Sequence, residues 1–247
     1  MRIIYLDGNF LKANAQLIEA FTPGVFKVKG VFETMLGLDG VVLDADVHLE
    51  RLRIGLKALG VQAPHINAAI LKEVLHINQL SSARVRVMVW QSQPYTHVMV
   101  VVLPYKISAK KTYKVCLVKT GRVADERLSY VKSLDYELFS QAYDQAITYG
   151  FDEALLLNRY GHIFEASRAN IFWIKDKVLY TPPLSSGCLS GITRQQVINQ
   201  AKKFKTTVKE VDLTLSILKK SDAAFLTNSL IGIKPIDVTS IRNISLD

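Results

Sequence analysis

Two periods of hydrophobic residues run along the first half of the chain and predict its elements. In residues 41–61, VVLDADVHLERLRIGLKALGV, leucines recur every three or four positions after a short apolar run, so we expect a strand and then a helix. Residues 67–77, NAAILKEVLHI, are typical of a second helix. In residues 84–90, RVRVMVW, valines alternate with arginine and methionine, which indicates a half-exposed strand. Further strands are expected at 96–105 and 112–119, so this half combines two helices with an antiparallel sheet.

The second half alternates short apolar segments with tight turns, which predicts a β-rich region with helices. One helix is expected from about Leu134 to Tyr149, where Gly150 ends it, and another over 192–204, ITRQQVINQAKKF. A loop, PPLSSGCLSG, precedes the second helix. Strands are expected at EALLLN (153–158), IFEAS (163–167), NIFWIK (170–175), VLYT (178–181), AAFLTNS (223–229) and IGIKPIDV (231–238).

A polar segment without a pattern separates the two halves. Residues 119–130, KTGRVADERLSY, have the composition of an interdomain linker. The 247 residues are enough for one large core or two smaller ones. We therefore expect an α+β chain of two domains, with a small α/β sandwich-like domain at residues 1–118, a linker at 119–129 and a larger β-rich domain with helices at 130–247.

The composition limits the class and the location of the protein. Apolar residues make up 49% and charged residues 21% of the chain, so we do not expect a disordered protein. No apolar run reaches the roughly 18 residues that a bilayer crossing needs, and the start, MRIIYLDGNF, does not resemble a signal peptide. Cys116 and Cys188 are the only cysteines, and no Cys-x-x-Cys or Cys/His cluster occurs. We therefore expect a cytoplasmic protein with neither a metal site nor a membrane partner.

The formal net charge of +9 indicates an anionic partner of some kind. The positive residues are scattered, and the densest runs, KISAKKTYK and AKKFKTTVK, have the character of solvated element ends. Small molecules that carry phosphates or carboxylates explain the charge as well as nucleic acid would. We therefore expect a small-molecule partner and no nucleic acid.

Lys132, in the segment SYVKSLDYELF, lies at the point where the chain enters an apolar region. One interpretation is that its stem packs while the ammonium reaches water. The other is that the lysine is a nucleophile or forms a Schiff base with a carbonyl compound. The lysine alone does not decide between them.

Glu165 lies inside the apolar strand expected at 163–167, where an unpaired buried carboxylate would be costly. Alternation leaves a second interpretation open, because a half-exposed strand would place Glu165 on the solvent side together with Ile163. Glu165 is therefore either a surface carboxylate or a buried acid with a partner.

The segment GCLSGITRQQV leads from a glycine loop into the first turn of a helix. A helix N-terminus presents unpaired N–H groups and the positive end of the helix dipole, so it suits phosphate. Gly191 allows close backbone approach, Ile192 and Thr193 can donate N–H groups, and Thr193 adds a hydroxyl. An ordinary helix cap looks similar. The segment lacks the Gly-Lys-Ser/Thr ending of a P-loop, and no Gly-x-Gly-x-x-Gly occurs.

A reactive lysine, a carboxylate in an apolar strand and a phosphate-binding helix end are together the groups that pyridoxal 5'-phosphate requires. The lysine binds the cofactor aldehyde, the acid keeps the ring nitrogen protonated, and the helix end holds the phosphate. The three features occur in one half of the chain, without a competing metal or nucleotide motif. The sequence therefore predicts a pyridoxal-phosphate enzyme.

The chain resembles the class IV, or fold type IV, pyridoxal-phosphate enzymes, which include branched-chain aminotransferases, D-amino acid aminotransferases and 4-amino-4-deoxychorismate lyases. The resemblance covers most of the chain, from about Gly30 to Pro235, and is densest from Asp152 to Val197. It implies a fold in which the larger C-terminal domain is a β-rich pseudo-barrel. The motifs that carry it are GVFETM, HLERL, VKSLDY, DEALLLNRYGHIFEASRANIF, TPPLSSGCLSGITRQQVI and TNSLIGIKPI.

The resemblance implies a role for each candidate residue around the cofactor ring. Lys132 would form the Schiff base and, once released by the substrate amine, would take the α proton as a base. Glu165 would pair with the pyridine nitrogen. Leu189 would pack against a face of the ring.

The resemblance also implies a phosphate site. Arg51, in HLERL, would reach the phosphate with its planar fork, although the same residue could be an ordinary surface arginine of a helix. Ile192 and Thr193, after Gly191, would bind the phosphate through their N–H groups. Thr227 would bind it through its hydroxyl.

Within this family we expect 4-amino-4-deoxychorismate lyase, which eliminates pyruvate and leaves p-aminobenzoate. The segment TNSLIGIKPI resembles the lyase branch more than the hydroxyl- and alanine-rich segments of the transaminases, and the chain is short, like the lyases. The alternatives are an amino-acid aminotransferase acting on branched-chain or D-amino acids, and a non-catalytic basic binding protein. The resemblance implies a homodimer with a small amino-acid-like substrate.

The group that binds the substrate carboxylates is not evident from the sequence. The loop WQSQPYTH lacks the arginine that the family often has there. Arg122 or a partner subunit remains as the source of this group.

Overall fold

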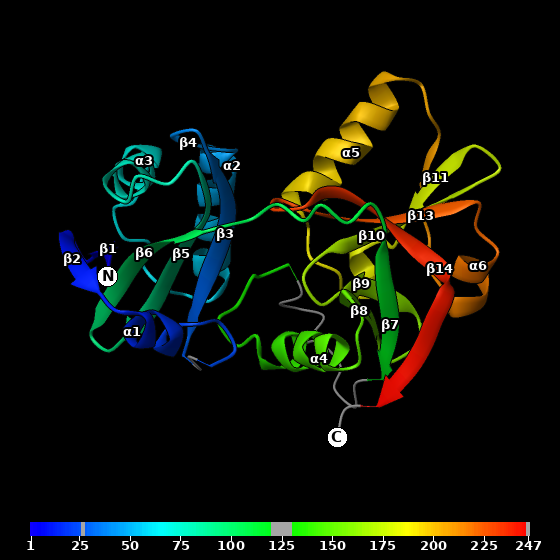
Figure 1. Ribbon diagram of the computed structural model, residues 1–247, viewed down its shortest axis with the longest axis horizontal. Coiled ribbons are helices and arrows are strands. Elements are labelled where there is room, and N and C mark those ends of the chain that lie inside the picture. Colours follow the sequence, from blue (N-terminus) through cyan, green and yellow to red (C-terminus); the bar gives the residue numbers. More distant parts are fainter. Residues whose placement is uncertain (26–27, 120–129, 246–247) are drawn as a thin grey trace. The chain divides into compact units, whose positions relative to one another are not determined.

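The computed structural model describes residues 1–25, 28–119 and 130–245, and they form an α+β fold, as the sequence predicts (Figure 1). The fold divides into two compact units. Unit 1 consists of Met1–Ile107 and Val131–Glu137, and unit 2 consists of Ser108–Tyr130 and Leu138–Asp247. Each unit has its own sheet and its own hydrophobic core.

Unit 1 is built on a six-stranded sheet in which each neighbouring pair is antiparallel. The alternation of valines in RVRVMVW is confirmed, because Val85, Val87 and Val89 all face the larger core of this unit. The strands, in spatial order, are β2 (Asn9–Ala13), β1 (Arg2–Leu6), β6 (Tyr95–Pro104), β5 (Ser82–Ser92), β3 (Gly30–Leu38) and β4 (Val41–Val42).

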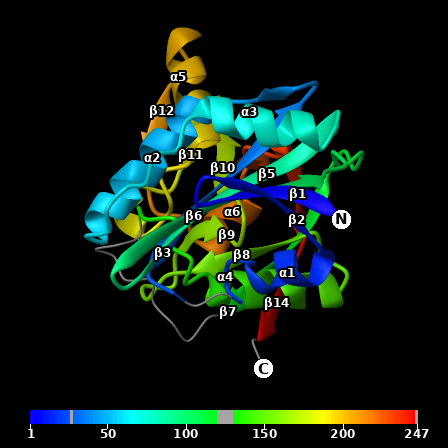
Figure 2. The ribbon, with the colours of Figure 1, turned by 90° about the vertical axis from the view of Figure 1, so that its left-hand side faces the viewer.

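Two helices cover one face of this sheet, as Figures 1 and 2 show. Helix α2 (Ala45–Ala58) packs on β3, and α3 (Ala68–Ile77) packs against β5 and β6. The leucines that predicted α2 lie in the core, and Leu49, Leu52 and Leu56 are almost completely buried. A short helix that the sequence analysis missed, α1 (Ala15–Ala20), contributes Ile18 to the core on the other face of the sheet.

Unit 2 is built on an eight-stranded mixed sheet. β14 is parallel to β7, β7 to β8, and β11 to β12, while the other neighbours are antiparallel. The strands, in spatial order, are β12 (Val208–Glu210), β11 (Val178–Thr181), β10 (Asn170–Lys175), β13 (Ala223–Asn228), β14 (Gly232–Ser245), β7 (Tyr113–Lys119), β8 (Glu153–Leu157) and β9 (Ile163–Ala166).

The sheet of unit 2 curls into a half-barrel, in line with the pseudo-barrel that the sequence predicts. The edge strand β9 runs directly into β10, from which four other strands separate it in the sheet, through a tight turn in which the Ala166 N–H donates to the Ala169 carbonyl at 2.7 Å. One face carries a core that includes Val115 and Leu117 of β7, and the alternate residues Cys116 and Val118 face a second core.

Three helices and a single 3₁₀ turn complete the described part of unit 2. Helix α4 (Glu137–Thr148) packs on the second core, which includes Cys116 and Val118. Helix α5 (Ile192–Lys203) packs on β13 and β12. Helix α6 (Leu215–Lys219) packs on β14, and the 3₁₀ turn η1 (Leu184–Ser186) lies in the loop before α5.

Two expected boundaries differ from the observed ones because of long-range pairing. The helix expected from Leu134 begins at Glu137, since the backbone before it pairs with β3 instead. The expected domain boundary lay at the linker 119–129, of which 120–129 fall outside the described residues. In the structure β7 belongs to unit 2, where it lies between β14 and β8, and Val131–Glu137 belongs to unit 1.

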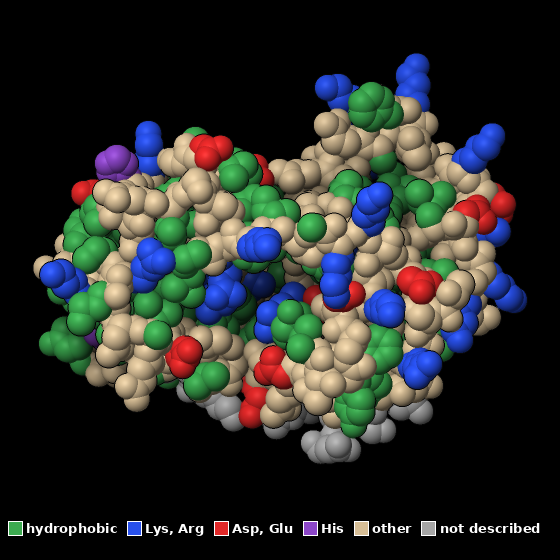
Figure 3. Space-filling model, viewed as in Figure 1, with side chains coloured by type: hydrophobic (Ala, Val, Ile, Leu, Met, Phe, Trp, Pro, Cys, Tyr) green, Lys and Arg blue, Asp and Glu red, His purple; other side chains and the backbone are tan. Residues whose placement is uncertain are grey.

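The surface agrees with the scattered charge in the sequence. Figure 3 shows one face of the molecule, on which Lys and Arg side chains are spread over many elements. None of the helices in residues 1–25, 28–119 and 130–245 has both the length and the apolar content that a bilayer crossing requires.

Candidate active site

Lys132 lies against the open edge of β3 in unit 1. Its carbonyl accepts the Phe32 N–H at 2.9 Å, and the Leu134 N–H donates to the Gly30 carbonyl at 3.0 Å. This close approach requires a glycine, because a Cβ on Gly30 would lie 2.8 Å from Leu134 Cδ1 and 2.4 Å from a neighbouring carbonyl. The lysine is thus carried by a segment that long-range hydrogen bonds fix, and not by the helix that follows.

Two aromatic rings surround the Lys132 ammonium group. Nζ lies 4.4 Å from the centroid of the Phe32 ring and 5.2 Å from that of Tyr136, and the two rings meet edge to face. The side chain is half-buried. Nζ therefore lies against the faces of two aromatic rings, which limit the positions that the amine can occupy.

Arg51 makes a bidentate ion pair with Glu33 on the α2 face of the same sheet. Nε donates to Glu33 Oε1 and Nη2 to Oε2, both at 2.7 Å. His48 Nδ1 lies 2.7 Å from Oε2. Burial raises the pKa of the Glu33 carboxyl, but the Arg51 charge and the hydrogen bonds of His48 and Arg51 outweigh it and lower the pKa to about 2. Glu33 is therefore ionised at every pH of physiological interest.

Glu165 lies on β9 of unit 2 and is only 6% exposed. The prediction left a solvent-facing carboxylate open, and the structure rules it out, because all four residues of β9 are buried. The Leu189 N–H donates to Glu165 Oε2 at 3.0 Å. A carboxylate can accept several hydrogen bonds, so this contact is compatible with a further donor such as a protonated ring nitrogen.

Hydrogen bonds hold the loop before α5 against β9 and β10, the two strands that flank the Ala166–Ala169 turn. Asn170 Nδ2 donates to the Leu189 carbonyl at 2.9 Å, while Glu165 accepts from the N–H of the same residue. A Cβ on Gly191 would lie 2.0 Å from Asn170 Oδ1. Leu189 and Gly191 are thus held next to Glu165, and Gly191 is the residue type that the close approach demands.

Helix α5 begins at Ile192, where the sequence predicts a phosphate-binding turn. Its N-cap, Gly191, offers no side-chain cap to the first N–H groups. Arg194, which is buried, donates through Nη2 to the Pro182 carbonyl and to Glu210 at 2.9 and 2.7 Å. Arg194 therefore anchors the first turn, and the N–H groups of Ile192 and Thr193 begin the helix.

Thr227 supplies an unsatisfied hydroxyl beside this turn. Its Cα pairs with that of Asn170 across β13 and β10. The residue is 1% exposed, and Oγ1 has no hydrogen-bond partner among the residues that the structure describes. A buried hydroxyl normally has a partner, so its position next to the α5 N-terminus indicates an external acceptor.

The cysteines do not belong to the reactive groups of the chain. Cys116 and Cys188 are both buried free thiols. Burial raises the pKa of each thiol to about 12, and for Cys188 the nearby Glu165 charge acts in the same direction. Both remain protonated at neutral pH and are poor nucleophiles.

Comparison with known proteins matches residues 30–238 to the amino-transferase class IV family. The chain belongs to the class IV aminotransferase family. The resemblance drawn from the sequence motifs is thereby confirmed. Class IV enzymes depend on pyridoxal 5'-phosphate, so this chain is a pyridoxal-phosphate-dependent aminotransferase or lyase.

Relatives of the class IV chain carry both of the names that the sequence analysis considered. A protein of Methanocaldococcus jannaschii named as a branched-chain-amino-acid aminotransferase is 31% identical over 94% of this chain and 86% of its own. The aminodeoxychorismate lyase of Bacillus subtilis is 28% identical over 94% and 85%. The crystal structure of the branched-chain aminotransferase of Thermoproteus uzoniensis with norvaline has a TM-score of 0.81 and 25% identity, covering 95% of this chain and 86% of that one.

The residues of unit 2 fit the class IV cofactor. Glu165 provides a buried carboxylate, Thr227 a buried hydroxyl without a described partner, and α5 an N-terminus whose cap is a glycine. These groups and Leu189 are brought together within unit 2, around the turn that joins β9 and β10. Lys132 and Arg51 lie in unit 1, where they contact consecutive residues of β3.

The sequence analysis missed the partners of the predicted residues. Glu33 and His48 were not assigned to the site, although GVFETM and HLERL contain them. No short-range pattern links Glu33 to Arg51, because they are 18 residues apart. Arg122, considered for substrate carboxylates, lies outside the described residues.

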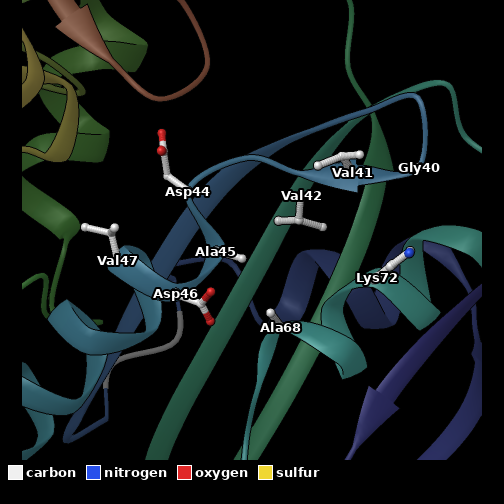
Figure 4. A pocket seen from close by; sticks show the side chains of 9 residues that line it. All are labelled: Gly40, Val41, Val42, Asp44, Ala45, Asp46, Val47, Ala68 and Lys72. Atoms are coloured by element: carbon white, nitrogen blue, oxygen red, sulfur yellow. The ribbon is translucent and has the colours of Figure 1, made fainter.

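An open hollow of about 400 Å³ also occurs in unit 1, away from the predicted residues (Figure 4). It lies between the β4 hairpin, the start of α2 and one face of α3. Its lining mixes exposed valines with charged side chains, and it contains none of the residues predicted for the cofactor. The lining residues are Gly40, Val41, Val42, Asp44, Ala45, Asp46, Val47, Ala68 and Lys72.

Proposed function

We propose that this class IV enzyme is an aminodeoxychorismate lyase, which releases pyruvate and leaves p-aminobenzoate. The observation that carries the proposal is the segment TNSLIG and the turn it forms. Asn228 Oδ1 accepts the N–H groups of Leu230 and Ile231, both at 2.9 Å, and Nδ2 donates to the Arg168 carbonyl at 2.9 Å. Alanine can make none of these bonds, and a hydroxyl carries its donor and acceptors on a single oxygen, whereas the amide places them on two atoms that face different partners. The turn thus depends on the asparagine that is typical of the lyase branch, and the similar B. subtilis lyase adds support.

In this proposal Lys132 is the residue that moves the substrate proton. Pyridoxal phosphate, when bound, supplies a ring that withdraws electrons from the substrate α carbon. Lys132 Nζ would hold the cofactor and, once released, would accept the α proton as a general base. Phe32 and Tyr136 lie beside Nζ and limit the positions that it can occupy.

The remaining predicted residues hold and orient the cofactor. Glu165 would accept a hydrogen bond from the protonated ring nitrogen, and Leu189, whose N–H donates to Glu165, would pack against the ring. The N–H groups of Ile192 and Thr193 and the Thr227 hydroxyl would bind the phosphate. Arg51 contributes the positive charge that a phosphate requires.

Arg86 is our candidate for a substrate carboxylate, in place of the arginine that the WQSQPYTH loop lacks. It lies on β5 two residues before Met88, which pairs with Phe32, the ring under Lys132. Residues two apart on a strand share a face, so Arg86, Met88 and Phe32 lie on one face of the unit 1 sheet. An arginine fork suits a carboxylate substrate better than a lysine does.

A branched-chain aminotransferase is the second candidate. The relative from M. jannaschii that carries this name is 31% identical, slightly more than the B. subtilis lyase at 28%. Both activities begin with the same removal of the α proton. In the aminotransferase the proton is then returned to the cofactor. In the lyase a bond within the substrate breaks instead, and pyruvate is released.

One paired assay tests the proposal. The purified protein is supplied with aminodeoxychorismate, and pyruvate and p-aminobenzoate are measured. In parallel it is supplied with branched-chain or D-amino acids and 2-oxoglutarate, and glutamate is measured. We expect the two elimination products in equal amounts and little glutamate. Glutamate formation without an aromatic product would reject the lyase in favour of the second candidate.

Glu165→Gln is expected to lower turnover by roughly 10²-fold while the cofactor still binds. The glutamine oxygen can still accept the Leu189 N–H, so the loop is preserved, but an amide stabilises a protonated ring nitrogen far less than a carboxylate. Cofactor occupancy by absorbance and steady-state rates separate the two effects. Glu73→Gln, an exposed change on α3, is the matched control. Unchanged turnover in Glu165→Gln would remove Glu165 from the proposed site.

A homodimer and a cytoplasmic location are also part of the proposal. The family resemblance supports the first, and the two reduced, buried cysteines are consistent with the second. Sedimentation of the purified protein would test the dimer directly.

A further inference from the structure

A buried ion-pair network in unit 1 joins Arg51 to two residues that have no role in the proposed chemistry so far. It consists of Glu33, His48 and Arg51, which we call the β3–α2 network. Glu33 and His48 are each 1% exposed, whereas the Arg51 side chain keeps 15% of its surface accessible. His48 and Arg51 are three residues apart on α2, so both reach the same carboxylate from one helix face.

The geometry of the network fixes the orientation of the arginine. Two parallel bonds from Nε and Nη2 hold the guanidinium in the plane of the Glu33 carboxylate. His48 Nδ1, at 2.7 Å from Oε2, fixes the carboxylate in turn. The Nη1 end of the guanidinium then points away from Glu33. A carboxylate that also binds a histidine leaves its arginine partner few alternative positions.

We propose that Glu33 and His48 are positioning residues, which hold Arg51 in the orientation that selects a phosphate-bearing cofactor. The inference rests on the proposed phosphate role of Arg51 and deepens it. Without Glu33 the arginine keeps its charge but gains rotamer freedom, so its contact with phosphate costs more conformational entropy. The network acts on the phosphate alone and leaves recognition of the ring unchanged.

The test compares two ligands that differ only in the phosphate. Apoprotein is titrated with pyridoxal 5'-phosphate and with pyridoxal, and binding is followed by absorbance. The ratio of the two dissociation constants measures phosphate recognition. We expect Glu33→Gln to reduce this preference about tenfold, the equivalent of one charge-assisted hydrogen bond, while pyridoxal binds as before. Glu50→Gln, an exposed glutamate on the same helix, is the matched control and should not change the ratio.

Arg51→Ala separates failure of the inference from failure of the proposed function. If Arg51 binds phosphate, Arg51→Ala lowers the preference, and adding Glu33→Gln to it has no further effect. If Arg51→Ala lowers the preference and Glu33→Gln alone does not, the positioning role is wrong and the phosphate role stands. If Arg51→Ala leaves the ratio unchanged, the phosphate role is wrong and the inference falls with it.

Substitutions of His48 provide a milder test in case Glu33→Gln does not fold. His48→Leu removes the hydrogen bond but keeps the Glu33–Arg51 pair, and we expect it to reduce the preference about threefold. Asn places an amide nitrogen near the position of Nδ1, so His48→Asn should restore most of the preference. A network that only ties α2 to β3 would lower the thermal midpoint in His48→Leu without changing the ratio, and this result would overturn the inference.

Discussion

Replacement of Lys132 by alanine is expected to reduce turnover by roughly 10³- to 10⁴-fold, the largest effect of any single change. The substitution removes both the amine that holds the cofactor and the base that takes the α proton. The fold should survive, because the backbone of Lys132 makes the hydrogen bond to β3 and the cation–π contacts of Nζ with Phe32 and Tyr136 are worth about 0.5–1 kcal/mol. The measurements are steady-state rates, and mass spectrometry after borohydride reduction, which should find no pyridoxyl group on the peptide.

A chemical rescue makes the prediction for Lys132 specific. Methylamine added to Lys132→Ala should restore part of the rate, because a small amine can occupy the space between the two rings. Lys57→Ala, an exposed lysine on α2, serves as the control and should retain full activity and the pyridoxyl label on Lys132. Undiminished turnover in Lys132→Ala would exclude Lys132 as the cofactor lysine.

Replacement of Gly191 by alanine is expected to lower cofactor affinity about tenfold and to destabilise unit 2 by roughly 2–3 kcal/mol. The cause is a steric clash and not backbone strain, because Gly191 has φ −70° and ψ 139°, a conformation that any residue adopts. The new Cβ would lie 2.0 Å from Asn170 Oδ1, so Asn170 must leave the Leu189 carbonyl. The loop that brings Leu189 to Glu165 then loses one of the two hydrogen bonds that hold Leu189 in place.

Titration with cofactor and thermal unfolding would measure the effect of Gly191→Ala. Ser185→Ala, an exposed change in the same loop, is the control. Because the most severe clash is with Asn170 Oδ1, Asn170→Ala combined with Gly191→Ala should be little worse than Asn170→Ala alone. Additive losses in the double variant would show that the contact between Gly191 and Asn170 is not the cause.

Elements that depend on local pattern were predictable from the sequence. The leucine spacing gave α2, and the alternation of valines gave β5, because a periodic apolar face determines both the element and its buried side. The helix α5 was also predicted, since both of its signals, Gly191 at the start and the apolar face of ITRQQVINQAKKF, lie next to each other in the sequence. The start of α4 was wrong by three residues, because tertiary pairing of Lys132 and its neighbours with β3 overrides their helical tendency.

The predicted site residues were found by type and spacing, but their partners were not. Alternation could not determine whether Glu165 is buried, because both faces of β9 are covered, with Ile163 in one core and Phe164 in another. The bond from Asn170 to Leu189 joins residues 19 apart, and the pair of Arg51 and Glu33 joins residues 18 apart. Such contacts follow from the folded arrangement, and a local period carries no information about them.

The short segment Val131–Glu137 belongs to unit 1, although the chain on both sides of it belongs to unit 2. Neither unit can therefore be expressed as one uninterrupted stretch of the gene. A fragment that starts at Ser108 would contain Lys132 but not the strand that fixes its backbone, and a fragment that ends at Ile107 would contain the strand without the lysine. Domain exchange between related enzymes would have to transfer this heptapeptide together with β3.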